Sequence, residues 1–125
     1  MAEQSGLPLS GVRVIEFSHM VMGPTVGVIL ADLGADVVKI EPINGDNTRR
    51  LRGSGAGYFA MYNRNKRSIC VDLKSEAGSA LAKRLINGAD VLVENFRPGA
   101  MDKLGYGYDE LSAENPGLIY CSARG

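Results

Sequence analysis

The sequence predicts an α/β fold in which a parallel sheet carries helices on both faces. Short runs of mainly apolar residues alternate with longer segments that have the apolar spacing of amphipathic helices. The short runs lack the strict polar alternation of a half-exposed strand, and this is typical of strands buried on both faces of a parallel sheet. A glycine follows two of the helical segments, where it favours termination of the helix.

The first unit consists of a strand, a helix and a second strand. Residues 12–17 are mostly apolar and predict a buried strand. The helix is expected from Pro24, which suits a first helical turn because it lacks an N–H group, to about Leu33. Gly34 supplies a left-handed cap, and residues 36–40 predict the next strand. At this spacing the three elements form a right-handed βαβ unit.

The pattern then repeats along the chain. We expect a strand at 68–72, a helix at 75–87 closed by Gly88, and strands at 91–94 and 118–122. The helix face toward the sheet is predicted to carry Ala77, Leu81, Leu85 and Ile86, with Glu76, Lys83 and Arg84 nearer the solvent. Open sheets of this kind bind ligands at the carboxyl ends of their strands, which directs attention to the loops after 12–17 and 91–94.

Length and charge narrow the class of protein. The 125 residues suit one domain, and the 14 basic and 14 acidic residues balance, so no global field favours nucleic acid or an anionic membrane. No secretion signal and no apolar run of roughly 20 residues occur. Cys70 and Cys121 fall in strands expected to be buried, and with one histidine no metal site is expected. Together these features predict a soluble protein of the cytoplasm.

The end of the chain leaves two interpretations open. The last expected strand, 118–122, is followed by no element that could cover it. This suggests the N-terminal part of a longer protein. The alternative is a naturally short domain whose last strand lies at a sheet edge.

The loop after the first strand contains His19. A polar side chain at the carboxyl end of a central strand is often functional, but a histidine there can also simply hydrogen-bond a neighbouring backbone group. Ser18 is adjacent, but neighbours in sequence are not a nucleophile and its base in space. His19 is therefore a candidate for an active-site loop, with no catalytic role assigned.

The loop at 95–99 has the chemistry of a nucleotide site. It places the amide of Asn95, the ring of Phe96 and the guanidinium of Arg97 before a Pro-Gly turn. This turn opens a short helix through Met101 and Leu104. A ring and a guanidinium stack on adenine, and arginine forks onto phosphate oxygens. The alternative is an ordinary polar loop in which Arg97 pairs with Glu94.

Two further basic clusters, Arg49, Arg50 and Arg52, and Arg64, Lys66 and Arg67, are either solvated surface or phosphate contacts. A nicotinamide site is disfavoured, although Glu41 stands 18 positions after Gly23, near the place of a ribose-binding acid. The first turn has one glycine where that fingerprint needs three, and the glycines at 53–57 follow an arginine-rich loop instead of a strand.

The motifs together carry a family resemblance. In chain order they are residues 9–16, 23–24, 30–42, 45–46, 63–68, 72–74, 89–99 and 115–116. This succession closely resembles the N-terminal part of the family III CoA-transferases, a group that includes formyl-CoA transferase, carnitine CoA-transferase and the α-methylacyl-CoA racemases. The resemblance covers nearly the whole chain.

The resemblance implies that residues 1–125 are the CoA-binding, Rossmann-like part of a large domain in an interlocked homodimer. It implies partners that are an acyl-CoA and a carboxylic acid, with coenzyme A passed between acids through an aspartyl acyl-enzyme. The positions that match CoA-contacting residues are Met20, Val21, Met22, Pro42, Val71, Asp72, Leu73, Lys74, Asn95, Phe96, Arg97 and Lys103.

The same resemblance also sets limits. Formyl-CoA transferase has glutamine and arginine at the positions of Val21 and Pro42, which argues against formyl-CoA and oxalate as substrates. The transferase nucleophile lies downstream of this chain, so no aspartate is assigned that role and the chain alone is expected to be inactive. An acyl-CoA racemase, and a non-catalytic nucleotide-binding or dimerisation module, remain alternatives.

Overall fold

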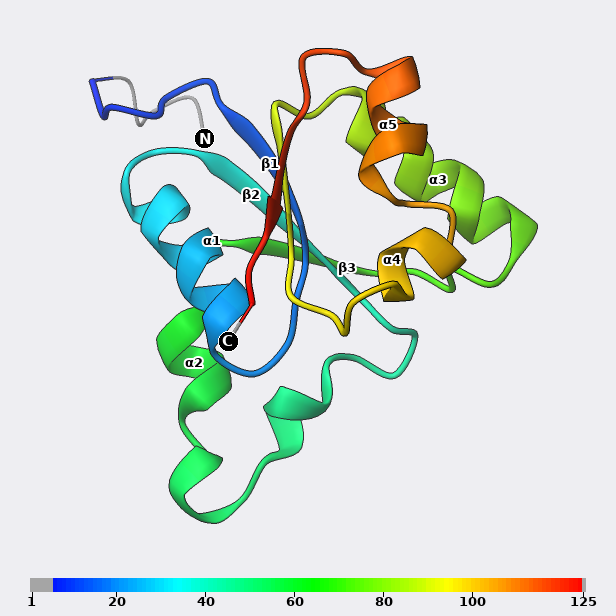
Figure 1. Ribbon diagram of the computed structural model, residues 1–125. Coiled ribbons are helices and arrows are strands. Elements are labelled where there is room, and N and C mark those ends of the chain that lie inside the picture. Colours follow the sequence, from blue (N-terminus) through cyan, green and yellow to red (C-terminus); the bar gives the residue numbers. More distant parts are fainter. Residues whose placement is uncertain (1–5, 125) are drawn as a thin grey trace.

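The computed structural model describes residues 6–124, which form one parallel sheet with helices on both faces (Figure 1). The strands are β1 (Arg13–Phe17), β2 (Asp36–Glu41), β3 (Arg67–Cys70), β4 (Val91–Glu94) and β5 (Ile119–Ser122). The α-helices are α1 (Met22–Asp32), α2 (Tyr58–Tyr62), α3 (Glu76–Asn87), α4 (Ala100–Lys103) and α5 (Tyr108–Glu114). The predicted fold class is confirmed, while α2 and α5 have no counterpart in the sequence predictions.

The strand order β3-β2-β1-β4-β5 puts β1 at the centre of the sheet. Val14 is the register partner of Val37 on β2 and of Val91 on β4, and all strand pairs are parallel. From β1 the chain builds one half of the sheet outward and then returns to start the other half at β4. The loops after β1 and β4 therefore meet at the point where the strand order reverses, which is where open α/β sheets bind ligands.

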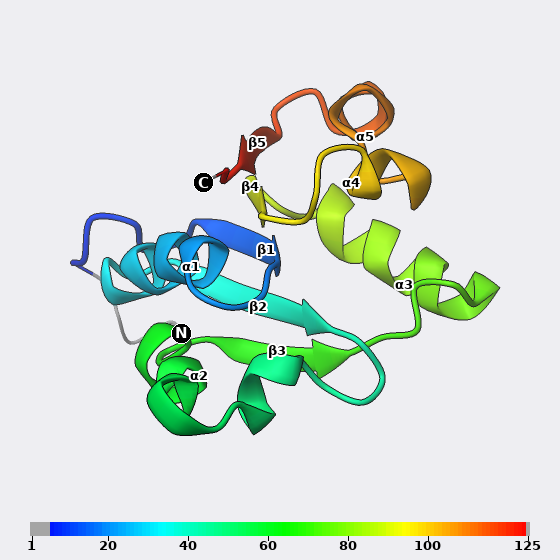
Figure 2. The same ribbon diagram turned by 60° about the horizontal axis from the view of Figure 1, so that its bottom comes forward.

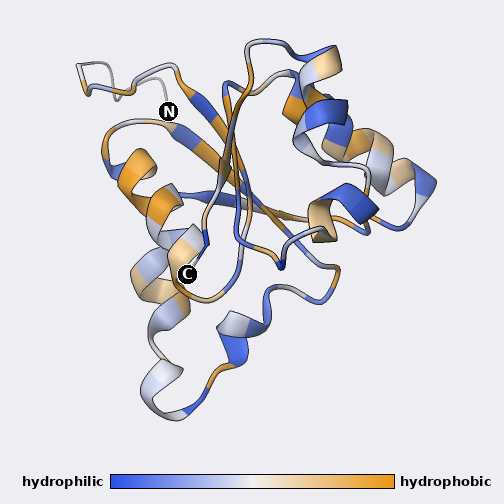
Figure 3. Ribbon diagram, viewed as in Figure 1, coloured by the Kyte–Doolittle hydropathy of each residue, from blue (hydrophilic) through white to orange (hydrophobic). Residues whose placement is uncertain are grey.

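Helix α1 lies on one side of the sheet and helices α3, α4 and α5 lie on the other (Figure 2), and two apolar clusters hold these layers together. On the side of α1, Val14, Val37 and Val93 pack with Ala31 and Ala35. On the side of α3, α4 and α5, the buried residues include Ile15, Phe17, Leu92, Ile86 and Met101. Neighbouring strand residues alternate between the two clusters, as side chains of a strand point to opposite faces. Figure 3 shows the apolar residues gathered along the central strands and on α1.

Helix α3 presents a face to the sheet that matches the predicted one in part, since Ile86 is buried and Leu85 packs against the core. Ala82 and Ile86 are fully buried, but Ala77 is exposed and Leu81 keeps 37% of its surface in solvent. Ser79 makes a hydrogen bond with the buried Tyr106, with 3.0 Å between their hydroxyl oxygens. The predicted start is confirmed, since the hydroxyl of Ser75 accepts a hydrogen bond from the Gly78 N–H.

The edge strands are less buried than the sequence predicts. β3 ends at Cys70, two residues before the expected Asp72, and most of its residues are exposed. Cys70 is consequently exposed, and Cys121 on β5 is only half-buried. Both strands lie at the edges of the sheet, where the helices do not cover both faces. The expectation of buried strands is correct for β1 and β4, whose residues lie between helices on both sides.

The glycine caps differ from one another. Gly34 has a φ of +106°, as expected for a glycine that ends a helix in a conformation other residues avoid. Gly88 closes α3 with a φ of −93°.

Within residues 6–124, no helix has both the length and the apolar character to cross a bilayer.

Candidate functional site

Two adjoining pockets open at the carboxyl ends of the strands. The large pocket, of about 390 Å³, is lined by Phe17, Ile40, Glu41, Pro42, Ile43, Val71, Asp72, Leu73, Lys74, Phe96 and Leu104. The small pocket, of about 200 Å³, is lined by Ser18, His19, Met20, Ile40, Pro42, Asp46, Asn47, Thr48, Leu51 and Phe96. Ile40, Pro42 and Phe96 belong to both pockets, so the two form one concave surface over β1 to β4.

The pockets collect many of the residues that the sequence predicts for the site. Pro42, Phe96 and residues 71–74 line the large pocket, while His19 and Met20 line the small one. Other predicted residues do not line either pocket: Val21, Met22, Asn95, Arg97 and Lys103. The predicted set therefore includes residues that form the pocket walls and residues that lie around them.

The β1 loop, residues 18–21, is held by side chains from distant segments. Asn95 Oδ1 accepts a hydrogen bond from the His19 N–H at 3.1 Å, and Asn95 Nδ2 donates to the His19 carbonyl at 3.0 Å. The Met20 N–H donates to Thr48 Oγ1 at 2.9 Å. Met20 has a φ of +64°, which residues other than glycine seldom adopt. The hydrogen bonds thus hold the loop in an uncommon conformation.

Gly23 lets α1 approach this loop closely. A Cβ atom at Gly23 would lie 2.7 Å from Asn95 Cγ and 2.7 Å from Ser18 Cβ. The glycine is required for packing against the Asn95 side chain. Pro24 lies in the first turn of α1, as predicted, although the helix begins at Met22.

The His19 ring points to Phe96. Their ring centroids are 5.5 Å apart with an interplanar angle of 41°. Among residues 6–124 no hydrogen bond of the imidazole is found, so the expected alternative of a ring bonded to neighbouring backbone is wrong. His19 is exposed and lines the small pocket, where a ligand would meet it.

A buried charge cluster lies beneath the β1 loop and consists of Glu16, Lys39, Asp46 and Lys66. Glu16 and Lys39 are register partners on β1 and β2. Lys39 Nζ lies 3.1 Å from Asp46 Oδ2, and Lys66 Nζ lies 2.9 Å from Glu16 Oε2. Burial lowers the pKa of Lys66, although the Glu16 carboxylate favours its charged form. Two acids and two lysines balance in charge, as a buried cluster requires.

Sequence reasoning missed this cluster. Its signal was the presence of Glu16 and Lys39 inside runs that otherwise predict buried strands. A buried charge in a strand needs an opposite charge near it, and neighbouring parallel strands supply that partner in register.

Glu41 is committed to an ion pair. Its carboxylate accepts hydrogen bonds from Arg49 Nε at 2.8 Å and Arg49 Nη2 at 2.7 Å, and also from the Ser68 hydroxyl and the Asp46 N–H. Burial alone would raise the pKa of Glu41, but these donors outweigh it and lower the pKa from 4.5 to about 2. This acid is therefore occupied and unavailable for a ribose, in agreement with the rejected nicotinamide site.

The two basic clusters of the sequence are mostly used inside the protein. Arg64 pairs with Asp32, and Arg67 pairs with Asp36. Arg50 donates to the carbonyl of Asn44. With Arg49 and Lys66 also paired, these contacts favour a structural role for the clusters over phosphate binding.

A different set of cations lines the large pocket or adjoins its lining residues in the chain. Lys74 lines the pocket, Arg97 follows the lining residue Phe96, and Lys103 precedes the lining residue Leu104. This cationic rim consists of Lys74, Arg97 and Lys103, all exposed. Within residues 6–124 none of the three has a carboxylate partner. The alternative pairing of Arg97 with Glu94 is wrong, because Glu94 pairs with Arg124 at 3.0 Å. The rim is therefore free to meet an anionic ligand.

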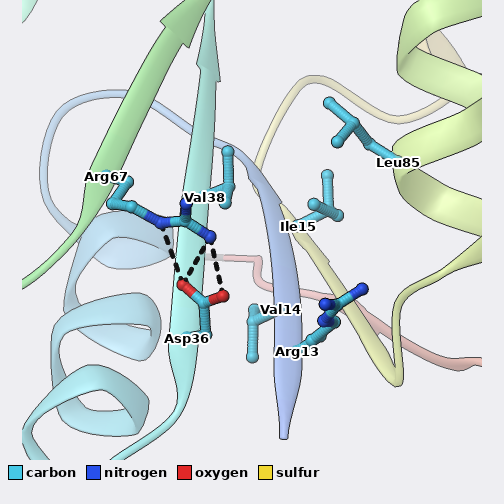
Figure 4. Close-up of a pocket in the computed structure, with 7 residues that line it drawn as sticks. All are labelled: Arg13, Val14, Ile15, Asp36, Val38, Arg67 and Leu85. Carbon is cyan, nitrogen blue, oxygen red and sulfur yellow. Dashed lines mark hydrogen bonds and ion pairs between the residues drawn. The ribbon is translucent and has the colours of Figure 1, made fainter. Parts of the chain in front are cut away.

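A third pocket, of about 230 Å³, lies at the amino ends of the strands and holds none of the predicted site residues (Figure 4). Its walls are Val14, Ile15, Val38 and Leu85, with Arg13 at the edge. The Arg67 guanidinium forks onto the Asp36 carboxylate there (Figure 4). Within the described residues, no three His, Cys, Asp or Glu side chains are placed to hold a metal ion.

Comparisons of the sequence with known proteins identify one family. The model of the family described as CoA-transferase family III matches residues 9–125. The chain is 46% identical to a succinate–glutarate CoA-transferase of Agrobacterium fabrum, over 94% of this chain and 32% of that protein. It is 47% identical to an acetyl-CoA:oxalate CoA-transferase of Acetobacter aceti, over 94% of this chain and 31% of that protein.

Solved structures superpose closely on this chain. A CaiB/BaiF family protein from Brucella suis superposes with a TM-score of 0.85 at 47% identity, covering 93% of this chain and 33% of that one. A hypothetical protein from Mycobacterium tuberculosis superposes with a TM-score of 0.85 at 46% identity, covering 92% of this chain and 33% of that one. The chain thus spans about a third of the length of the relatives it matches.

Proposed function

Because this chain belongs to CoA-transferase family III, we propose that it is the CoA-binding portion of an enzyme that moves CoA between carboxylic acids. The observation that carries the proposal is an apolar pocket, the large pocket, with Lys74 in its lining and with Arg97 and Lys103 next in the chain to the lining residues Phe96 and Leu104. CoA needs both features, since its nucleotide end is anionic and its adenine and pantetheine arm have apolar surface. Phe96, Val71 and Leu73 would contact the adenine or the arm.

Arg97 is the residue we assign to the phosphates first. Its guanidinium is exposed and has no carboxylate partner within residues 6–124, and it follows Phe96 directly in the chain. Lys103 and Lys74 would add further positive charge for the CoA phosphates. Met20, Val21, Met22, Pro42, Asp72 and Asn95 complete the proposed CoA site, and His19 would face the acyl end in the small pocket.

The chemistry proposed for the longer protein uses an aspartate as nucleophile. A carboxylate oxygen attacks the thioester carbon, the carbon–sulfur bond breaks, and CoA leaves as a thiolate. The thiolate then attacks the aspartyl carbonyl of the mixed anhydride, which releases the donor acid and leaves an enzyme–CoA thioester. An acceptor carboxylate reverses both steps and leaves as the new acyl-CoA.

We place this nucleophile outside the 125 residues. Two aspartates line the pockets, and both already have contacts that explain them. Asp46 is buried against Lys39, and Asp72 is exposed with Oδ1 accepting from the Lys74 N–H at 3.1 Å. We therefore propose that the chain alone binds CoA without turnover. The full-length protein is proposed to be an interlocked homodimer in the cytoplasm.

The test is a calorimetric titration of the full-length protein with CoA. We expect Arg97→Ala to weaken binding by about 1.5 to 3 kcal/mol, roughly 10- to 150-fold, because a charge-assisted hydrogen bond is lost. The matched control is Arg84→Ala, which removes an exposed arginine on α3 away from the pockets. Equal affinities of the Arg97 variant and the unchanged protein would contradict the assignment.

A second measurement separates transfer from racemisation. Incubation of a 2-methylacyl-CoA with the full-length protein in deuterated water should leave the α-proton in place, because CoA transfer does not break that bond. Exchange of the α-proton would favour the acyl-CoA racemase instead. Binding of CoA with neither activity would favour a non-catalytic module.

A further inference from the structure

A buried lysine lies beneath the small pocket and contacts both of its walls. Lys39 is 1% exposed, and its Nζ donates to the Ser18 carbonyl at 2.9 Å and to Ser18 Oγ at 3.1 Å. On the other side it lies 3.1 Å from Asp46 Oδ2. Ser18 opens the β1 loop, and Asp46 caps the short 3-10 helix, Asn47–Arg50, in the segment after β2. One ammonium group therefore joins two segments that face each other across the pocket.

The contacts continue from Asp46 to the tip of the β1 loop. Asp46 Oδ1 accepts from the Thr48 N–H at 2.9 Å and from the Thr48 hydroxyl at 2.8 Å. Because the hydroxyl proton is used in this way, Thr48 Oγ1 is left as an acceptor. The Met20 N–H donates to that oxygen at 2.9 Å. Lys39, Asp46 and Thr48 thus form a continuous chain of contacts that ends at the Met20 backbone.

The Met20 backbone needs such support. Its φ of +64° is unfavourable for a side chain larger than glycine, so the loop would relax if its hydrogen bonds were lost. Asn95 holds His19 from the side of β4, and the chain of contacts from Lys39 holds Met20 from the side of β2. Both residues of the loop line the small pocket, whereas Lys39 does not.

We propose that Lys39 is a positioning residue, which holds the β1 loop and the Asp46–Thr48 turn in the conformation that receives the ligand. The inference rests on the proposed CoA-binding function and adds a residue that acts through Met20 without touching CoA. When only a fraction of molecules has the competent loop, the apparent affinity falls to that fraction of its intrinsic value.

Lys66 provides the control for a purely structural role. Its side chain is 2% exposed and pairs with Glu16 in the same charge cluster. It also donates to the Pro24 carbonyl and to Asn63 Oδ1, but it contacts neither Ser18 nor Asp46. Lys39→Leu and Lys66→Leu therefore remove the same charge from the same cluster, and only the first breaks the link between the pocket walls.

The experiment uses full-length protein labelled with ¹³C at the methionine methyl groups. Lys39→Leu should shift or broaden the Met20 methyl signal and weaken CoA binding about tenfold or more, as expected for a loop that is rarely competent. Lys66→Leu should leave both the signal and the affinity unchanged. Equal effects of the two variants, or no effect of Lys39→Leu, would overturn the proposal.

The proposal can still be tested if a variant does not fold or if the protein does not bind CoA. If Lys39→Leu does not fold, Thr48→Val keeps a side chain of similar shape and leaves Lys39 in place, but it removes the hydroxyl that joins Asp46 to the Met20 N–H, so the same shift and loss are expected. Unchanged values for Thr48→Val would then overturn the proposal. If the unchanged protein does not bind CoA, the proposed function fails, while the Met20 signals of the two lysine variants still decide whether Lys39 holds the loop.

Discussion

Two groups of cations in this chain have opposite surroundings. In and around the buried charge cluster, Lys39, Lys66 and Arg49 each face a carboxylate. On the cationic rim, Lys74, Arg97 and Lys103 face none among residues 6–124. Both regions derive from basic residues that look alike in the sequence. The difference shows that the carboxylates nearby, and not the density of basic residues, distinguish a structural cation from one available to a ligand.

The energetics of the two regions follow from this difference. Removal of one partner from a buried pair leaves an uncompensated charge, which is strongly destabilising. Removal of an exposed, unpaired cation leaves nothing buried and has little effect on folding. Variants of the cluster should therefore change stability, while variants of the rim should change ligand affinity alone.

The largest effect is expected for Glu41→Gln, which breaks the pair with Arg49. The pKa of Glu41 is lowered from 4.5 to about 2 in the folded chain. A shift of this size corresponds to about 3 kcal/mol of stability. Since the folded pKa is the lower one, this contribution is present above about pH 4.5 and is lost as the pH falls toward 2.

Urea unfolding between pH 7 and pH 2.5 measures this effect. The unchanged protein should be more stable than Glu41→Gln at pH 7, and the two curves should converge in acid. The control is Asp32→Asn, which removes an exposed pair with Arg64 and should change stability little. A constant gap between Glu41→Gln and the unchanged protein at every pH would contradict the predicted role of the carboxylate.

A smaller loss of stability is expected for Gly27→Ala on α1. A Cβ atom at this position would lie 1.7 Å from Glu16 Oε1, so the helix or the carboxylate must move. Overpacking of this kind costs about 1 to 3 kcal/mol. Thermal unfolding should show a lower midpoint than for Gly57→Ala, where the added methyl meets open space. If both alanine variants keep the same midpoint, the charge cluster tolerates more movement than its packing indicates.

The smallest effect is expected on the rim. Lys103→Ala should weaken CoA binding by about 0.5 to 1 kcal/mol, as for an exposed charge, and should leave the unfolding midpoint unchanged. The loss should shrink in high salt, which screens exposed charges. Lys83→Ala on α3 is the control. A fall in stability with Lys103→Ala would erase the distinction between rim and cluster.

The fold was predictable because it depends on periodicity and apolar runs. The βαβ unit from residue 12 to 40 and the helix from Ser75 follow from strand-length apolar runs, helical spacing and caps, all of which are local in sequence. Burial was less predictable, because whether Cys70 is covered depends on where β3 lies in the sheet. The short α2, of five residues, has too few positions to show a period.

The location of the two candidate pockets could be predicted from the sequence. The contacts within them could be predicted only in part. The loops after β1 and β4 follow from the sheet topology, and His19 and Phe96 do lie at the pockets. The role of Asn95 as a clamp on His19 depends on a contact between residues 76 positions apart, which no local pattern reveals. The same holds for Thr48, whose hydroxyl supports Met20 across the pocket.

The Asn95 clamp also has a consequence for the order in which the molecule is assembled. During synthesis β1, α1 and β2 are made before β4, so one edge of the central strand has no partner until residues 91–94 are available. Contacts between such distant segments form slowly, and an unpaired strand edge invites association with other chains. The β1 loop reaches its final shape only when β4 docks and delivers Asn95. The β1 loop thus matures only after residues 91–94 have been made, although its own residues are translated much earlier.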